Sequence, residues 1–215
     1  MLAVMIGILV LLGVTVVHET GHWLAVQVKR GRVLRVQIGR GPTLWSHTTS
    51  EGTEVVVSLL PFGGMIHYDG VGSGSAQAVV AISGAVANLG FSLAMFAGAV
   101  WVVGAEGMPF SDGTEGVLGY AVSSVGTWFW MVPGAVRDLV TTGMALELNR
   151  GFRAIVGLLM EGGAADVSYV AAATSSVWAA LNLIPVPIVR TDGWLVGRAL
   201  WRLVRGGRNG SSGVG

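Results

Sequence analysis

The sequence predicts an α-helical polytopic membrane protein, in which a core of three transmembrane helices carries a small membrane-associated β-hairpin and an interfacial helix. Three observations lead to this fold class. Hydrophobic residues make up 52% of the chain and charged residues 12%, about half the charged share of a soluble domain. The mean hydropathy is +0.67. Three stretches are long enough and poor enough in charge to cross a bilayer, so we treat residues 1–215 as a single membrane domain.

The first predicted span covers residues 1–28. Residues 1–17 carry no charge, and the apolar run continues to Val28. This length exceeds the about 20 residues that a transmembrane helix requires. Inside the run lies the sequence His18-Glu19-Thr20-Gly21-His22. Ionisable side chains are costly in such a segment, and their presence there indicates a functional site.

The spacing of this motif indicates a metal site. On a helix, positions i and i+4 lie on one face, so both imidazoles can reach one metal ion. Glu19 between them is then placed to act as a general base on a water molecule. The chain contains no cysteine, so any metal must use His, Asp or Glu side chains. The alternative is a helix whose histidines hydrogen-bond to their neighbours.

Residues 33–68 are expected to form a β element that lies on the cytoplasmic side or re-enters the membrane. Strands are predicted at residues 33–39 and 54–60, a turn at 61–65, and a further extended stretch at 66–68. An exposed edge of this element would suit the binding of an extended substrate strand. A purely structural hairpin is an equal alternative.

The second predicted span covers residues 77–104, which carry no charge over 28 positions. The stretch 119–146 is expected to be an interfacial or re-entrant helix, because its aromatic cluster Trp128-Phe129-Trp130 suits the membrane–water boundary. A fourth spanning helix at this position is the alternative. It would place the C-terminal arginines outside the cell.

The third predicted span covers residues 166–189, followed by an amphipathic helix at 194–205 and a flexible tail at 206–215. Asp192 follows this span at its cytoplasmic end, and two histidines with one carboxylate and a water form a known catalytic zinc set. Asp192 is therefore the expected third ligand, the alternative being an ordinary helix cap. Asn182 either hydrogen-bonds between helices or anchors a substrate backbone.

Basic residues set the expected orientation. Five of them follow the first span with no acidic residue among them, namely Lys29, Arg30, Arg32, Arg35 and Arg40. Such a cluster marks the cytoplasmic side. The N-terminus is therefore expected outside a bacterial cytoplasmic membrane, with the metal site toward the cytoplasm. Because the basic clusters border the bilayer, lipid explains them and no nucleic-acid partner is expected.

Three motifs, in this order, resemble those of a known family. They are the His-Glu-x-x-His at 18–22, Gly84-x-x-x-Asn88 at the head of the second span, and Asn182-x-x-Pro185 followed by Asp192-Gly193. The chain resembles the site-2 proteases, which are intramembrane zinc metalloproteases of peptidase family M50. The segment from Leu60 to Gly64 resembles the re-entrant hairpin of the bacterial branch that cleaves anti-sigma factors.

The resemblance implies one catalytic zinc ion held by His18, His22 and Asp192, with Glu19 activating water. It implies a substrate-binding role for four further residues, Asn182, Asn88, Gly63 and Gly64. The substrate would be a single-pass membrane protein in the lipid bilayer, such as an anti-sigma factor, that an upstream site-1-type protease has already shortened. Hydrolysis would occur in or near its transmembrane segment.

Two features depart from the family pattern. Many relatives carry a PDZ domain between the second and third core spans, and the short connection here leaves no room for one. Arg190 and Thr191 lengthen the stretch that precedes Asp192. These departures keep open the alternative that the chain is a catalytically inactive relative, or a non-proteolytic metal-binding scaffold or transporter.

Overall fold

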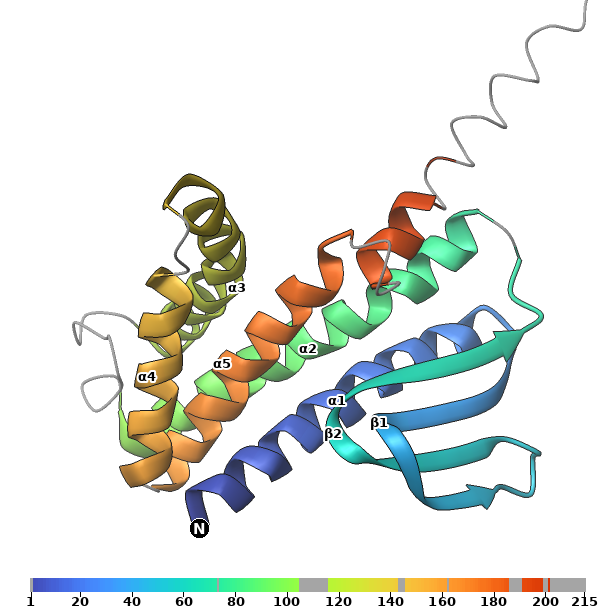
Figure 1. Ribbon diagram of the computed structural model, residues 1–215, viewed down its shortest axis with the longest axis horizontal. Helices are drawn as coiled ribbons and strands as arrows, with labels where there is room; N and C mark the ends of the chain where they lie inside the picture. Colours follow the sequence, from blue (N-terminus) through green and yellow to red (C-terminus); the bar gives the residue numbers. More distant parts are fainter. Residues whose placement is uncertain are drawn as a thin grey trace, which may run out of the picture. The chain divides into compact units, whose positions relative to one another are not determined.

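The computed structural model describes residues 2–72, 74–104, 116–142, 146–161, 163–185, 191–198 and 201. Figure 1 shows the order of the elements along the chain, which are α1 (Leu2–Val28), β1 (Arg32–Thr48), β2 (Glu54–Asp69), α2 (Ser75–Val103), α3 (Val117–Thr142), α4 (Leu146–Glu161) and α5 (Ala164–Leu183).

Contacts divide the chain into two compact units. The first unit comprises Met1–Val14 and Asn88–Leu181, and the second comprises Thr15–Ala87 and Asn182–Gly215. Three helices, α1, α2 and α5, contribute residues to both units. All residues of the metal-ligating motif, and the entire hairpin, belong to the second unit.

Helix α1 ends where the apolar run meets the first basic residues. Arg30 adopts the left-handed conformation with φ 58°. Its N–H donates to the carbonyl of Gln27 at 2.9 Å, and the N–H of Gly31 donates to the carbonyl of Val26 at 2.9 Å. This pair of bonds is a Schellman motif, which satisfies the last carbonyls of the helix and turns the chain into β1.

Strands β1 and β2 pair antiparallel, and both bend along their length. Because of the bends, β1 pairs with β2 along both of its edges: Val36 pairs with Ile66 on one side and with Val55 on the other. The bends include two glycines with positive φ, Gly39 (84°) and Gly63 (68°). A Cβ at Gly39 would collide with the carbonyl oxygen of Leu60, so the crossing of the two strands requires glycine there.

The observed hairpin extends beyond the predicted strands. The predicted stretches 33–39, 54–60 and 66–68 all lie in strands, but the predicted turn at 61–65 is a bend within β2 rather than an end of pairing. Residues 43–48, which were not predicted as strand, continue β1 and pair with 54–58. The pair Gly41-Pro42 suggests that the strand ends there. The strand nevertheless continues, because proline is tolerated at a sheet edge or a β-bulge.

The core of the second unit joins α1, α2 and the hairpin. Ala25 and Val26 of α1 pack with Val33 of β1 and Val80 of α2, and all four are buried. Ile66 and Tyr68 of β2 pack against this cluster. These contacts fix one face of the hairpin against the helix that carries the histidine motif.

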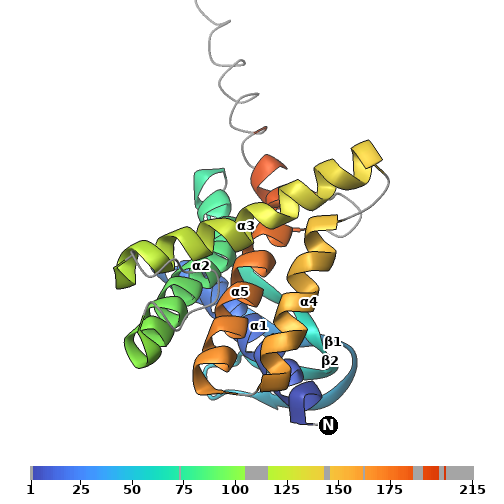
Figure 2. The ribbon, with the colours of Figure 1, turned by 90° about the vertical axis from the view of Figure 1, so that its left-hand side faces the viewer.

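The first unit is held together by an aromatic cluster. Phe96 of α2 contacts Tyr120 of α3 and Tyr169 of α5 edge to face, with ring centroids 6.3 Å and 5.0 Å apart. The hydroxyl of Ser92 donates to the carbonyl of Ala172 at 2.7 Å, which ties α2 to α5 with a buried hydrogen bond. Figure 2 shows α3 and α4, which complete this unit.

Two helices in the described part of the chain are long and apolar enough to cross a membrane, namely α1 and α2. They correspond to the predicted spans 1–28 and 77–104. The third predicted span, 166–189, begins within α5, but α5 does not reach the same apolar threshold. A three-helix core therefore stays a prediction.

The remaining predicted elements are covered only in part. Helix α3, which is continuous through Pro133, covers residues 119–142 of the predicted interfacial stretch 119–146, and its interfacial or re-entrant placement stays a prediction. Helix α4 was not predicted. Of the predicted helix 194–205, residues 194–198 and 201 are described and are helical. The tail 206–215 lies outside the described residues.

Candidate metal centre

The histidine motif occupies two successive turns on one face of α1. His18 and His22 are both buried, with exposed fractions of 4% and 6%. Their rings lie edge to face with centroids 4.8 Å apart, and their Nε2 atoms are 3.2 Å apart. The helical spacing of four residues thus brings two nitrogen ligands to one point.

Asp192 reaches the same point from the short helix 192–198. Its Oδ2 lies 3.0 Å from Nε2 of His18 and 3.3 Å from Nε2 of His22. The hydroxyl of Thr191 donates to the carbonyl of Ile184, which folds the chain back on itself before Asp192. A Cβ at Gly193 would collide with the carbonyl of Leu183, so this return requires glycine.

The carboxyl of Asp192 is suited to remain ionised. Burial by itself raises the pKa of Asp192, but its interactions with the two imidazoles outweigh burial and hold that pKa below its ordinary value. Burial, and after it the negative charge of Asp192, raises the pKa of the Tyr68 hydroxyl. Tyr68 of β2 is therefore a protonated neighbour of the site at neutral pH.

A hydrogen bond orients the ring of His22. Its Nδ1 lies 2.7 Å from the carbonyl oxygen of Val80 in α2. A carbonyl can only accept, so Nδ1 carries the proton and Nε2 presents a lone pair toward Asp192. Ser83, whose hydroxyl donates to the same carbonyl at 2.7 Å, adds a second polar group at this position. Metal-binding histidines are typically held in this way.

The three converging atoms fit a zinc ion. Ligands bound to one tetrahedral zinc at about 2.0–2.1 Å lie about 3.3–3.4 Å apart, and the observed separations are 3.0, 3.2 and 3.3 Å. Oδ2 of Asp192 faces both imidazoles, and a ring can donate to it only where its Nε2 carries a proton, which Nε2 of His22 does not. A buried carboxylate facing the lone pair of His22 calls for a cation between them, and two histidines with one carboxylate are zinc ligands.

Glu19 lies beside this set and is itself buried, with 4% exposed. No described residue hydrogen-bonds to its Oε2. Its other oxygen lies so close to β2 that a Cβ at Gly64 would collide with it. A cavity of about 410 Å³ between α1 and the hairpin is bordered by Glu19, Trp23 and Val36, among others. Oε2 of Glu19 is thus free of hydrogen bonds to the described residues, and the Glu19 side chain borders a cavity large enough for water molecules or part of a ligand.

Gly84 in α2 is a residue of the site that the sequence analysis did not assign. A Cβ there would lie 2.5 Å from Nε2 of His22 and 2.7 Å from Nε2 of His18. Gly21 of α1 makes a similar close approach, since its Cβ would collide with Ala87 and the carbonyl of Ser83. The small residues of the Gly84-x-x-x-Asn88 motif were a visible signal of close helix packing.

The predicted substrate-binding residues fall in different places. Gly64 lies against Glu19, and Gly63 lies in the bend of β2 beside the side chain of Arg40. Asn182 is half-buried near the end of α5 and belongs to the second unit. Asn88 belongs to the first unit, where its carbonyl accepts a hydrogen bond from Ser175. The substrate-binding role of all four stays a prediction.

Comparison with known proteins identifies one family. The model of peptidase family M50 matches residues 6–212. The regulator of sigma-E protease RseP of Escherichia coli (strain K12) is 33% identical over 145 residues, which are 59% of this chain and 30% of that protein. Protease RseP of Yersinia pestis is 42% identical over 59 residues, 27% of this chain and 13% of that protein.

A relative from Pasteurella multocida (strain Pm70), named as a candidate zinc metalloprotease, is also 42% identical over 59 residues, which are 27% of this chain and 13% of that protein. The matched part of the chain thus spans less than a third of the length of these curated relatives.

Proposed function

Because the chain belongs to peptidase family M50, we propose that it is a zinc metalloprotease that hydrolyses peptide bonds in or near the transmembrane segment of single-pass membrane proteins. One observation carries the proposal: Nε2 of His18, Nε2 of His22 and Oδ2 of Asp192 converge within 3.3 Å of one another beside the uncommitted carboxylate of Glu19.

The residues of the chain divide the chemistry between them. A zinc ion, when bound by His18, His22 and Asp192, supplies Lewis acidity that polarises a carbonyl and lowers the pKa of water. Glu19 accepts a proton from the attacking water at its carboxylate and donates it to the leaving amine. The Val80 carbonyl holds the proton on Nδ1 of His22, so that Nε2 remains a ligand. Burial of His18, Glu19 and His22 limits access of bulk water.

The hairpin is the proposed site where the substrate backbone is held. A peptide bond within a helix is shielded by its own hydrogen bonds, so the substrate must unwind before hydrolysis. Residues 64–69 of β2 lie on an outer edge of the sheet, and Gly64 of that edge touches the Glu19 carboxylate. A substrate strand added to this edge would present its backbone beside the general base. Asn182 would anchor a further part of that backbone.

The substrate class follows from the relatives. Two of them carry the name RseP, and one of these is named a regulator of sigma-E protease. We therefore propose an anti-sigma-factor-like substrate that an upstream protease has shortened. The family places the chain in a membrane, and α1 and α2 are long and apolar enough to span it. An N-terminus outside a bacterial cytoplasmic membrane, with the metal site toward the cytoplasm, is part of the proposal.

The test is cleavage of a single-pass reporter by the purified, zinc-loaded protein in detergent. We expect wild-type protein to cleave, and Glu19→Gln to retain its zinc and fold while cleaving at least about 100-fold more slowly, the range for loss of a general base. A chelator should stop the wild-type reaction, and added zinc should restore it. Zinc content, measured on the same samples, separates loss of metal from loss of the base.

Two results would count against the proposal. Cleavage by a pure Glu19→Gln preparation at the wild-type rate would remove the general-base role. Zinc bound by wild type without turnover of any single-pass reporter would favour the inactive metal-binding scaffold.

A further inference from the structure

A further cavity lies between α3 and α4, and the described residues that line it all belong to the first unit. Its volume is about 790 Å³, which is within the range of ligand sites, about 300–1,000 Å³. At about 30 Å³ per water, it is far too large for a single ion or water molecule. Its walls combine apolar side chains with two arginines, a pattern that the proposed protease chemistry does not use.

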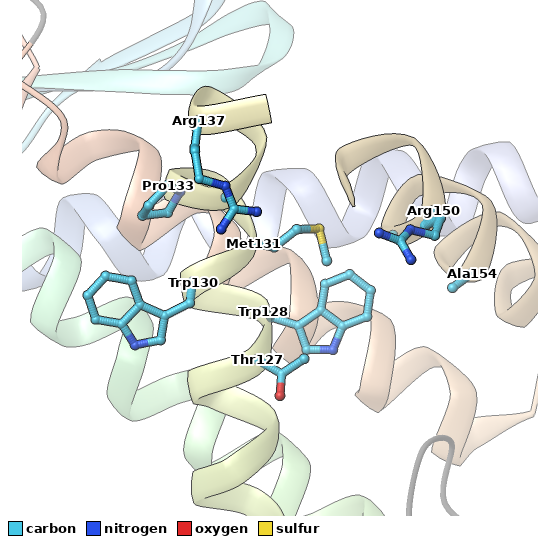
Figure 3. Close-up of a pocket in the computed structure, with 10 residues that line it drawn as sticks. Thr127, Trp128, Trp130, Met131, Pro133, Arg137, Arg150 and Ala154 are labelled. Atoms are coloured by element: carbon cyan, nitrogen blue, oxygen red, sulfur yellow. The ribbon is translucent and has the colours of Figure 1, made fainter. Parts of the chain in front are cut away.

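The apolar wall is held in place by the protein's own contacts. Trp128 is buried, and its Nε1 donates to the hydroxyl of Tyr169 at 3.0 Å. Gly151 of α4 allows Met131 of α3 to approach, because a Cβ at Gly151 would lie 2.5 Å from the sulfur of Met131. Figure 3 shows Trp128 and Met131 directed toward α4, where Ala154 faces them. This wall therefore exists before any ligand binds.

The two arginines come from different helices and border the same cavity. Arg137 belongs to α3 and Arg150 to α4, and Figure 3 shows both guanidinium groups beside the apolar wall. Arg137 forms an exposed ion pair with its neighbour Asp138 at 3.0 Å. No described residue forms an ion pair with Arg150. The cavity thus carries an excess of positive charge that an anion would neutralise.

We propose that this cavity binds an anionic phospholipid, with its phosphate on Arg137 and Arg150 and an acyl chain against Trp128, Met131 and Ala154. Guanidinium groups bind phosphate through paired hydrogen bonds. The bilayer supplies an amphiphile with this combination of charge and apolar surface. Basic pockets beside membrane helices are known to hold lipid headgroups.

A peptide fits the cavity less well than a lipid. Among the described lining residues, few side chains can form hydrogen bonds. They are the two arginines, the hydroxyl of Thr127 and the indole N–H groups of Trp128 and Trp130. The indole of Trp128 is already committed to Tyr169. A peptide would bury backbone N–H and carbonyl groups there without partners, which is costly. An acyl chain has no such groups.

The experiment is native mass spectrometry of the full chain in detergent, titrated with phosphatidylglycerol or phosphatidylcholine of identical acyl chains. We expect wild type to bind phosphatidylglycerol more tightly. The variant Arg137→Gln/Arg150→Gln should bind it at least about tenfold more weakly, because two charge-assisted contacts are lost. Its binding of phosphatidylcholine, whose phosphate is offset by the lipid's own choline cation, should fall by less. Arg153→Gln, an exposed position on α4 outside the cavity, is the matched control and should bind like wild type.

Three results would overturn the proposal. Equal retention of the two lipids by wild type would do so without relying on any variant. Unchanged phosphatidylglycerol binding in a folded double variant would do so as well. Displacement of the lipid by millimolar inorganic phosphate would show that the site binds the free anion instead. None of these measurements depends on protease activity.

Discussion

Gly84 determines how closely α2 approaches the two histidines. Its hydrogen occupies the space where any side chain would meet the imidazole rings, with Nε2 of His22 2.5 Å from a built Cβ. A methyl carbon does not approach a ring nitrogen this closely, so an alanine would move the helix or the rings. Movement of α2 would take the Val80 carbonyl away from Nδ1 of His22, and movement of the rings would take their Nε2 atoms away from Asp192.

The variant Gly84→Ala should therefore lose metal. We expect zinc affinity to fall about 10- to 100-fold, the range for residues that support metal ligands, while the protein still folds. Gly90→Ala is the matched control, because a Cβ at this position of the same helix meets nothing within 4 Å. Competition for zinc with a chromogenic chelator measures both affinities. Equal affinities in the two variants would show that the close approach of α2 is not needed.

Gly64 plays a different part, because it touches the base rather than the ligands. Its φ is not in the left-handed region, so the backbone allows alanine. The nearest atoms that a methyl group would meet belong to the Glu19 carboxylate and the carbonyl of Gln37. We expect Gly64→Ala to keep its zinc but to lower kcat, since Glu19 must move. Gly72→Ala, where a Cβ meets nothing within 4 Å, should keep the wild-type kcat. Loss of zinc in Gly64→Ala would instead point to a general disruption of the site.

At the scale of single residues, the sequence identifies the side chains of the metal centre but not the backbone features that position them. His18, Glu19 and His22 follow from helical spacing alone. Asp192 lies 3.0 Å from His18 although two residues lengthen the segment before it, a proximity that depends on the return of the chain at Gly193. The Val80 carbonyl is a backbone atom that any residue could supply, so no side-chain pattern could have identified it.

At the scale of helices and strands, the crossing of α1 and α2 in the second unit depends on small residues. Gly21 faces Ala87 and the carbonyl of Ser83. In a lipid bilayer no hydrophobic effect drives helices together, so close van der Waals packing at small residues holds them in contact. The same crossing brings Val80 and Gly84 to the histidines. Helix packing and site geometry are therefore one feature of the structure.

Gly21→Ala should lower thermal stability. We expect a loss of about 1–3 kcal/mol from overpacking, seen as a lower melting temperature in detergent. Gly13→Ala on the same helix meets nothing within 4 Å and should be neutral or stabilising, because alanine is the better helix former. Equal melting temperatures for the two variants would contradict the close crossing.

Hairpin topology was the part of the fold least accessible from sequence. Strand propensity located residues 33–39 and 54–60, and both are strands. The pairing of Val36 with residues on both sides depends on bends at Gly39 and Gly63, and a glycine in a sequence does not reveal whether a strand bends or ends there. Helix α4 (Leu146–Glu161) was not predicted, because its charged residues interrupt the apolar sequence and leave no membrane-span signal.

For the whole molecule, composition identified the class and two of the spans. A charged share of 12% and long apolar runs were sufficient to predict α1 and α2 as membrane helices, and both meet that criterion. Helix α5 carries polar groups such as Ser175 and Ser176, which are buried, and this lowers its hydropathy. A third span at 166–189, predicted because residues 167–189 carry no charge, therefore stays a prediction.

The central claim is that this chain hydrolyses peptide bonds in or near a transmembrane segment. The most direct measurement is the mass of both fragments released from a single-pass reporter by wild-type protein, with Glu19→Gln in parallel. We predict one cut within the transmembrane segment or a few residues from it, seen with wild type and absent with Glu19→Gln. A cut confined to the soluble part of the reporter, or the same fragments from Glu19→Gln, would contradict the account.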